Sequence, residues 1–92
     1  MLEKTIEARL GKRLKGAGWL YFKFVSPGNN GVPDRLAVAP DGRVYFIELK
    51  TDTGVLSPMQ TQQIERLRAH GATVRVIRGS DGTDAFLLEV GV

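Results

Sequence analysis

The sequence contains no cysteine, and no run of apolar residues approaches the length of a membrane-spanning helix. Disulfide bonds and metal sites built on thiolates are therefore excluded, and an intracellular location is permitted. A membrane span needs about 20 consecutive apolar residues, so we expect no contact with a membrane. The first ten residues, MLEKTIEARL, carry charges that a signal peptide would not have. We therefore expect a cytoplasmic protein.

The composition is that of one small globular domain, which we expect to span residues 1–92. Hydrophobic residues make up 42% of the chain and charged residues 25%, which suits a single core. The net charge of +3 and the pI of about 9.6 are compatible with nucleic-acid binding. Basic residues concentrate near the start of the chain, as a solvated helix face or as a flank for phosphate groups: Lys4, Arg9, Lys12, Arg13 and Lys15.

The hydrophobic pattern predicts alternating helices and strands. Leu2, Ile6, Leu10 and Leu14 recur every four residues, which predicts an amphipathic helix over residues 1–16. For the end of the chain, DAFLLEV, a helix and an edge strand are both open, and we favour the helix. The expected fold is a small α/β domain of order αβββαβ followed by that helix. After the first helix we predict strands over 19–25, 34–39 and 43–50, a helix over 58–70, a strand over 72–77 and a GSDGT turn over 79–83.

The second helix has clear start and stop signals. Ser57 suits the N-cap, Pro58 the first helical position, and Gln60 completes a capping box. Gly71 ends the helix. Because this helix connects two strands, we expect the strand after it to run parallel to the strand before it.

The segment Pro-Asp-Gly at 40–42 allows the register of a hairpin to be predicted. This sequence fits a three-residue loop with a left-handed glycine, which pairs Ala39 with Arg43 and places Asp34 opposite Glu48. Directly opposed residues point to the same face, with Cβ atoms about 4.5–5.5 Å apart. A two-residue loop would instead place Asp34 opposite Leu49, which still leaves it beside Glu48.

Two carboxylates at this spacing need a positive partner. At an effective dielectric constant of 20 their repulsion is about 3 kcal/mol, a large fraction of the stability of a small domain. Lys50, on the same face of the strand as Glu48, could provide the charge, and so could a divalent cation bound by oxygen ligands. A surface ion pair of little energetic value is the alternative.

Two other polar residues border predicted apolar stripes. Gln60 aligns with Ile64 and Leu67 on the second helix, near the end of the strand that carries Lys50. It could also serve only as a capping residue. On the first helix Glu7 and Glu3 have nearly the same relation to the apolar positions, so periodicity alone does not separate them.

The stretches GVPDRLAV, VYFIELK and LSPMQTQQIERLRAHGATVRVI together resemble the VRR-NUC family. This family belongs to the PD-(D/E)xK nuclease superfamily, which includes restriction endonucleases and archaeal-type Holliday junction resolvases. The resemblance extends from the first helix to the fourth strand. It implies a restriction-endonuclease-like fold, a mixed sheet flanked by helices.

The resemblance also implies roles for individual residues. Asp34 and Glu48 become metal ligands, with the backbone carbonyl of Leu49 as a third, and Lys50 becomes the catalytic lysine. Gln60 matches the glutamine beside the site. Glu7 matches the glutamate of the first helix, where it could bind a second metal ion or position a metal-bound water, and Glu3 is kept in reserve. Weaker candidates for contacts with the DNA backbone are Lys4, Arg9, Lys12, Lys23, Ser26, Asn29 and Asn30.

The resemblance thus implies an endonuclease that uses Mg²⁺ or Mn²⁺ to hydrolyse phosphodiester bonds, in branched DNA such as Holliday junctions. A homodimer would offer two active sites to the two strands of a junction. Small domains of this kind resemble phage proteins that act in the host cytoplasm. Two other readings stay open: a nucleic-acid-binding accessory protein with a nuclease fold but no turnover, and a small structural domain with an ion-paired hairpin.

Overall fold

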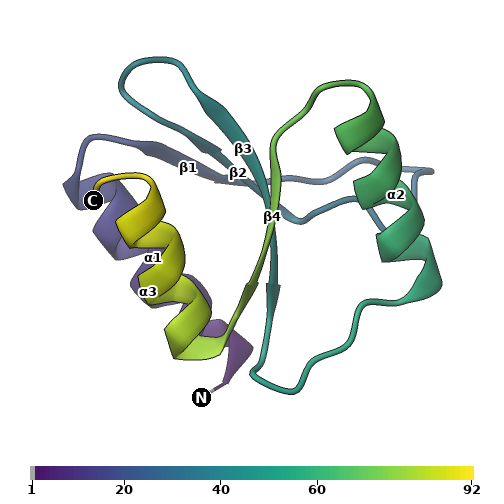
Figure 1. Ribbon diagram of the computed structural model, residues 1–92, viewed down its shortest axis with the longest axis horizontal. Coiled ribbons are helices and arrows are strands. Elements are labelled where there is room, and N and C mark those ends of the chain that lie inside the picture. The colour runs from purple at the N-terminus through teal and green to yellow at the C-terminus, as the bar shows by residue number, and fades with distance from the viewer. Residues whose placement is uncertain (1) are drawn as a thin grey trace.

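The computed structural model describes residues 2–92, which fold into three layers with one sheet between helices (Figure 1). Two helices lie on one side of the sheet and one helix lies on the other. None of the helices in residues 2–92 is long and apolar enough to cross a membrane. The elements are α1 (Glu3–Gly16), β1 (Leu20–Lys23), β2 (Arg35–Val38), β3 (Val44–Lys50), α2 (Pro58–Ala69), β4 (Val74–Arg78) and α3 (Gly79–Glu89).

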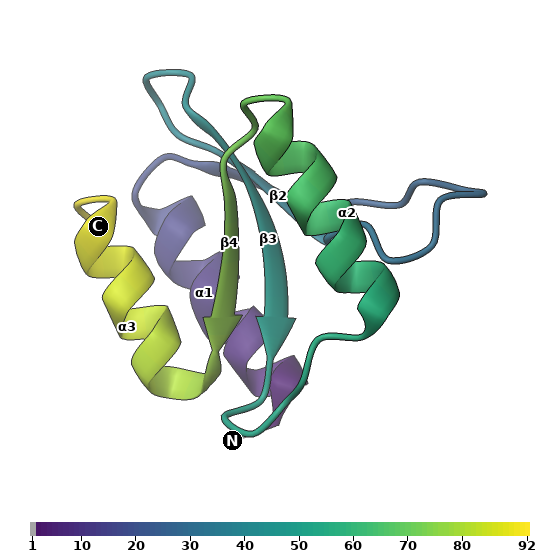
Figure 2. The same cartoon turned by 45° about the vertical axis from the view of Figure 1, so that its right-hand side comes forward.

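The sheet is mixed, as expected, with the strand order β1-β2-β3-β4. β1 and β2 pair antiparallel, as do β2 and β3, whereas β3 and β4 pair parallel. Figure 2 shows the arrows of β3 and β4 ending at the same edge of the sheet, with α2 connecting the two strands. The parallel pairing predicted from the connecting helix is therefore confirmed.

The β2–β3 hairpin has the predicted three-residue loop. Ala39 N donates a hydrogen bond to Arg43 O at 2.8 Å, and Gly42 N donates to Ala39 O at 2.9 Å. Gly42 has a φ of +92°, in the left-handed region that glycine adopts without strain. The observed pairs Arg35↔Ile47 and Val38↔Val44 have the register predicted from this loop.

The core lies between the sheet and the helices α1 and α3. Alternation along β3 places Tyr45, Ile47 and Leu49 on this side, and Glu48 and Lys50 on the α2 side. The predicted stripe of α1 is confirmed at Ile6, Leu10 and Leu14 but not at Leu2, which is exposed. Full burial of one such side chain contributes roughly 1.5–3 kcal/mol. Buried residues of this core include Ile6, Leu10, Leu14, Trp19, Tyr21, Tyr45, Ile47, Leu49, Ile77, Phe86 and Leu87.

Most element boundaries differ from the prediction by one or two residues, and the start of α3 differs by more. β1 ends at Lys23, before the predicted Val25, although Phe24 N still donates to Asp34 O at 2.8 Å. The GSDGT segment is not a turn but the start of α3. Its small polar residues suit the first turn of a helix, and the buried Thr83 hydroxyl donates to Gly79 O at 2.9 Å. The terminal helix itself, preferred over a strand, is confirmed.

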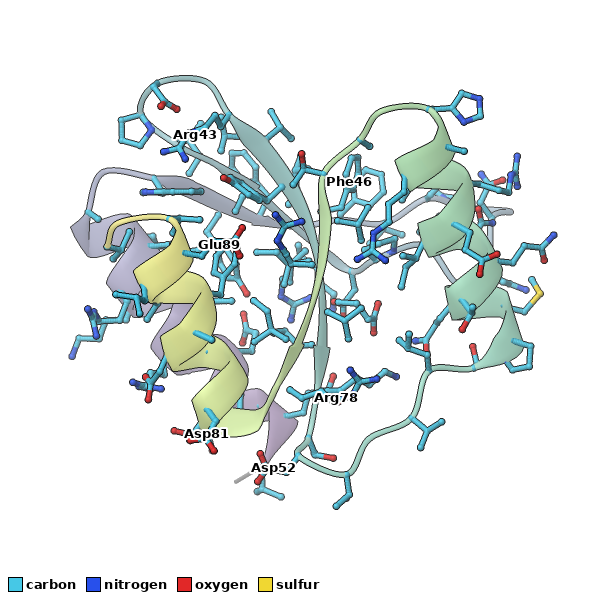
Figure 3. All side chains as sticks on the ribbon, viewed as in Figure 1. Arg43, Phe46, Asp52, Arg78, Asp81 and Glu89 are labelled. Carbon is cyan, nitrogen blue, oxygen red and sulfur yellow. The ribbon has the colours of Figure 1, made fainter. Side chains whose placement is uncertain are left out.

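The end of the sheet where β3 and β4 finish is crossed by the β3–α2 connection. Figure 3 shows Asp52, Arg78 and Asp81 gathered there. Arg78 Nε donates to Gly54 O at 3.2 Å, and an added Cβ at Gly79 would lie 1.5 Å from Asp52 Oδ1. These contacts fix the segment that follows Lys50 against the start of α3.

Candidate active site

The hairpin register brings Asp34 to the position opposite Glu48. The last pair within the strands is Arg35↔Ile47, and one further step along the same register reaches Asp34 and Glu48. Phe24 N donates to the Asp34 carbonyl, which holds this residue in line with β2. The two carboxylates therefore share the α2 side of the sheet, as the loop predicted.

Glu48 is a buried carboxylate, with a side chain that is only 6% exposed. Its Oε2 accepts a hydrogen bond from Gln60 Nε2 at 3.2 Å and lies 3.8 Å from Lys50 Nζ. Burial and the neighbouring charge of Asp34 raise the pKa of Glu48 to about 7, although Lys50 acts in the opposite direction. Burial and Asp34 thus outweigh the positive charge of Lys50.

Asp34 has two oxygens in different surroundings. Oδ2 lies 3.4 Å from Arg35 Nη1, whereas Oδ1 is buried and has no hydrogen-bond partner among residues 2–92. A buried acceptor without a partner is costly. Together with the raised pKa of Glu48, it marks a place where a cation would satisfy both carboxylates. The residues present therefore fit a divalent metal ion with a preference for oxygen ligands.

The donors available for such an ion are few. No group of three or more His, Cys, Asp or Glu residues that could hold a metal ion occurs among residues 2–92. A metal ion between Asp34 and Glu48 would need further oxygen ligands from the backbone, from water or from a phosphate group. The Leu49 carbonyl is adjacent in the chain, and the Leu49 side chain is anchored in the core at 1% exposure.

Gln60 makes both the capping contacts and a contact with Glu48. Its backbone N donates to Ser57 Oγ at 3.1 Å, and its Oε1 accepts from Ser57 N at 2.9 Å, which completes the capping box. The other end of the same amide, Nε2, donates to Glu48. Capping therefore fixes the amide so that its NH₂ group faces the buried carboxylate.

Glu7 lies at the edge of this site and contacts Arg35, a residue that was not predicted from the sequence to belong to it. Its Oε1 accepts from Arg35 Nε at 3.3 Å, and Arg35 in turn contacts Asp34. Arg35 could have been noticed from its position directly after Asp34. Strand alternation, however, sends its side chain to the α1 side of the sheet. Glu3 is exposed, and its charge contributes to the raised pKa of Glu48.

The weaker candidates for DNA contacts have mixed surroundings. Lys4, Lys12 and Lys23 are exposed. Arg9 instead forms an ion pair with Asp84 on α3. In the loop between β1 and β2, Asn29 Nδ2 donates to Ser26 Oγ at 2.9 Å, and Asn30 O accepts from Gln63 Nε2 at 3.2 Å.

Comparison with known proteins identifies the family to which this fold belongs. The family model of the VRR-NUC domain matches residues 6–81. A protein named "Putative nuclease p44", from Acyrthosiphon pisum secondary endosymbiont phage 1, is 39% identical over 79 residues, which cover 86% of this chain and 85% of that protein. A solved structure of a VRR_NUC domain aligns with a TM-score of 0.87 and 31% identity, over 95% of this chain and 94% of the other. The chain belongs to the VRR-NUC family of nuclease domains.

Proposed function

We propose that this nuclease domain is a metal-dependent DNA endonuclease whose active site is built on Asp34 and Glu48. The observation that carries the proposal is the pair of opposed carboxylates, one buried with a pKa raised to about 7 and the other with a buried oxygen that has no hydrogen-bond partner in the described part of the chain. Mg²⁺ or Mn²⁺ would be held by Asp34, Glu48 and the Leu49 carbonyl. When bound, the ion supplies Lewis-acid polarisation of the scissile phosphate.

Lys50 and Gln60 would support the reaction beside the metal ligands. Lys50 lies on the same face as Glu48 and can orient the attacking water, help to take its proton and offset negative charge in the transition state. Gln60, fixed by its capping contacts, keeps the Glu48 carboxylate in one orientation through its Nε2 donor. The exposed lysines of α1 and Lys23 are available for the DNA backbone.

Branched DNA is the proposed substrate, and a homodimer is the proposed assembly. Both rest on the resemblance to junction resolvases, since a symmetric dimer offers two active sites to two strands. The structure supports a second copy as the occupant of one uncovered apolar surface. Leu20, Phe22 and Val44 are 55%, 49% and 43% exposed on the α2 side of the sheet, away from the end of β3 where Gln60 of α2 contacts Glu48. An uncharged surface of this kind can be self-complementary across a two-fold axis.

The experiment incubates the protein with labelled four-way junction, flap and duplex DNA in Mg²⁺, Mn²⁺ or EDTA. We expect cutting that requires metal and disappears in Asp34→Ala and Lys50→Ala, with the junction cut fastest. Asp41→Asn is the matched control, because Asp41 is also a paired acid of this hairpin but lies at its far end with Arg43. Binding without cutting in any metal would instead support an accessory protein with a nuclease fold.

A further inference from the structure

Two buried polar atoms have no hydrogen-bond partner in the described chain, and both belong to neighbours of Arg35. They are Asp34 Oδ1 and Tyr21 Oη. Tyr21 and Arg35 lie on the same face of neighbouring strands as diagonal neighbours, because Tyr21 pairs with Ala37, two residues from Arg35. Burial raises the pKa of Tyr21, and Arg35 opposes that rise. The phenol is therefore neutral and leaves Arg35 as the charged group at this position.

Arg35 is itself largely buried and holds two acidic residues at once. Its side chain is 15% exposed. Nε donates to Glu7 Oε1 at 3.3 Å, while Nη1 lies 3.4 Å from Asp34 Oδ2 and donates to the Asp34 carbonyl at 2.9 Å. The guanidinium thus connects α1 to the end of β2.

The contact with Arg35 makes the two carboxylate oxygens of Asp34 unequal. Oδ2 is held by Arg35, and Oδ1 is left without a partner. Glu48 shows a similar division, because Gln60 and Lys50 both contact its Oε2. Each carboxylate thus has one oxygen beside donors of this chain, Asp34 Oδ2 at 3.4 Å from Arg35 Nη1 and Glu48 Oε2 at 3.2 Å from Gln60 Nε2, which leaves the other oxygen available to a ligand.

We propose that Arg35 is a positioning residue that fixes Asp34 Oδ2 and so presents Oδ1 to the metal ion, and that Glu7 acts through Arg35. This inference rests on the proposed function. A planar guanidinium can reach Glu7 and Asp34 from different nitrogens, whereas a lysine ammonium is a single point of charge. The positive charge of Arg35 would by itself repel a nearby cation, and the negative charge of Glu7 offsets this repulsion.

Arg35→Lys keeps the positive charge at this position but removes the planar guanidinium, so it separates the effect of charge from the effect of geometry. Arg35→Lys, Glu7→Gln and the parent protein are titrated with MnCl₂ by calorimetry without DNA, and the kcat and KM of DNA cleavage are then measured in Mn²⁺. Arg75→Lys is the control, since Arg75 also lies on a strand and pairs with an acid, Glu89, on the neighbouring helix α3. Thermal melts verify that each variant folds.

We expect Arg35→Lys to weaken Mn²⁺ binding by about tenfold, as is typical for residues that orient metal ligands. It should lower kcat with little change in KM for DNA. Glu7→Gln should also weaken Mn²⁺ binding and lower kcat, but less than Arg35→Lys does. The number of Mn²⁺ ions bound per chain should stay the same. Arg75→Lys should match the parent. If Arg35→Lys does not fold, Glu7→Gln decides, because it leaves Arg35 and Asp34 in place.

Several results would overturn the proposal. Parent-like Mn²⁺ binding by Arg35→Lys would mean that only the charge matters. A raised KM with unchanged kcat would make Arg35 a DNA contact. Loss of one bound Mn²⁺ in Glu7→Gln would make Glu7 a direct ligand. A parent protein that neither binds Mn²⁺ nor cuts DNA would overturn the proposed function and, with it, this inference.

Discussion

At the scale of single residues, the burial of the Glu48 carboxylate should cost stability. A carboxylate with a side chain only 6% exposed, beside Asp34, holds its proton more tightly in the folded protein than in the unfolded chain. The folded pKa is about 7 and the ordinary value is 4.5. The protein without metal should therefore lose stability as the pH rises from about 4.5 to 7 and then level off.

Glu48→Gln should remove this pH dependence and stabilise the protein without metal. At pH 8 we expect a gain of about 1–3 kcal/mol in the free energy of unfolding, because the 2.5-unit rise in pKa corresponds to an upper value of about 3 kcal/mol. Urea denaturation in EDTA at pH 5 and pH 8 measures the effect. Glu89→Gln is the control: Arg75 lowers the pKa of Glu89, so this variant should show no gain. A large loss at pH 8 in Glu48→Gln would identify a structural ion pair instead.

Gln60 and Ser57 provide variants that separate capping from the site. Gln60→Glu keeps an acceptor for Ser57 N but replaces the donor to Glu48 with a third carboxylate, so cleavage should fall by at least about tenfold while α2 stays intact. Ser57→Ala should cost about 1 kcal/mol of stability and leave the cleavage rate of the folded protein near that of the parent. Urea denaturation and single-turnover cleavage measure both quantities. The reverse pattern would show that Gln60 is only a capping residue.

At the scale of elements, the loop between β1 and β2 determines where Asp34 lies. Gly31 in this loop has a φ of +88° and packs against the first turn of α2, where an added Cβ would lie 2.6 Å from the Met59 carbonyl. Gln63 Nε2 donates to Asn30 O in the same contact. Asp34 comes three residues after Gly31, so the contact of the loop with α2 helps to place the Asp34 carboxylate.

Gly31→Ala should therefore affect both stability and catalysis. We expect a loss of about 2 kcal/mol or more, from the left-handed backbone and the overlap with Met59, together with a lower kcat. Gly28→Ala is a matched control in the same loop, because Gly28 has a φ of +82° but nothing within 4 Å of an added Cβ. It should cost only about 1 kcal/mol and leave kcat unchanged. Equal effects of the two variants would contradict a role for the loop in placing Asp34.

Local rules predicted much of this arrangement. The hairpin register followed from Pro40, Asp41 and Gly42, and the start of α2 followed from Ser57, Pro58 and Gln60. Arg35 was missed, because its importance depends on Glu7, which is 28 residues away in sequence. The start of α3 was missed because small polar residues such as those of GSDGT favour both turns and first helical turns.

At the scale of the whole molecule, the exposed apolar residues of the sheet should form an interface between two copies. Phe46 marks the boundary of this surface, since Figure 3 shows it between the strands and α2, and register aligns it with Leu36 and Phe22. Phe22→Glu should convert a dimer to a monomer in analytical ultracentrifugation. Leu88→Glu is the control, because Leu88 is 83% exposed but belongs to α3, on the opposite side of the sheet. A parent protein that is monomeric at micromolar concentration would contradict the dimer.

The most direct measurement of the central claim is the cleavage rate of Glu48→Gln in Mg²⁺, taken together with its stability in EDTA. If Glu48 is a metal ligand held in an unfavourable position for function, the variant should be more stable than the parent without metal and cut DNA at least about a hundredfold more slowly. A variant that is less stable than the parent, or that still cuts DNA at the parent rate, would contradict the assignment of Asp34 and Glu48 as the metal site.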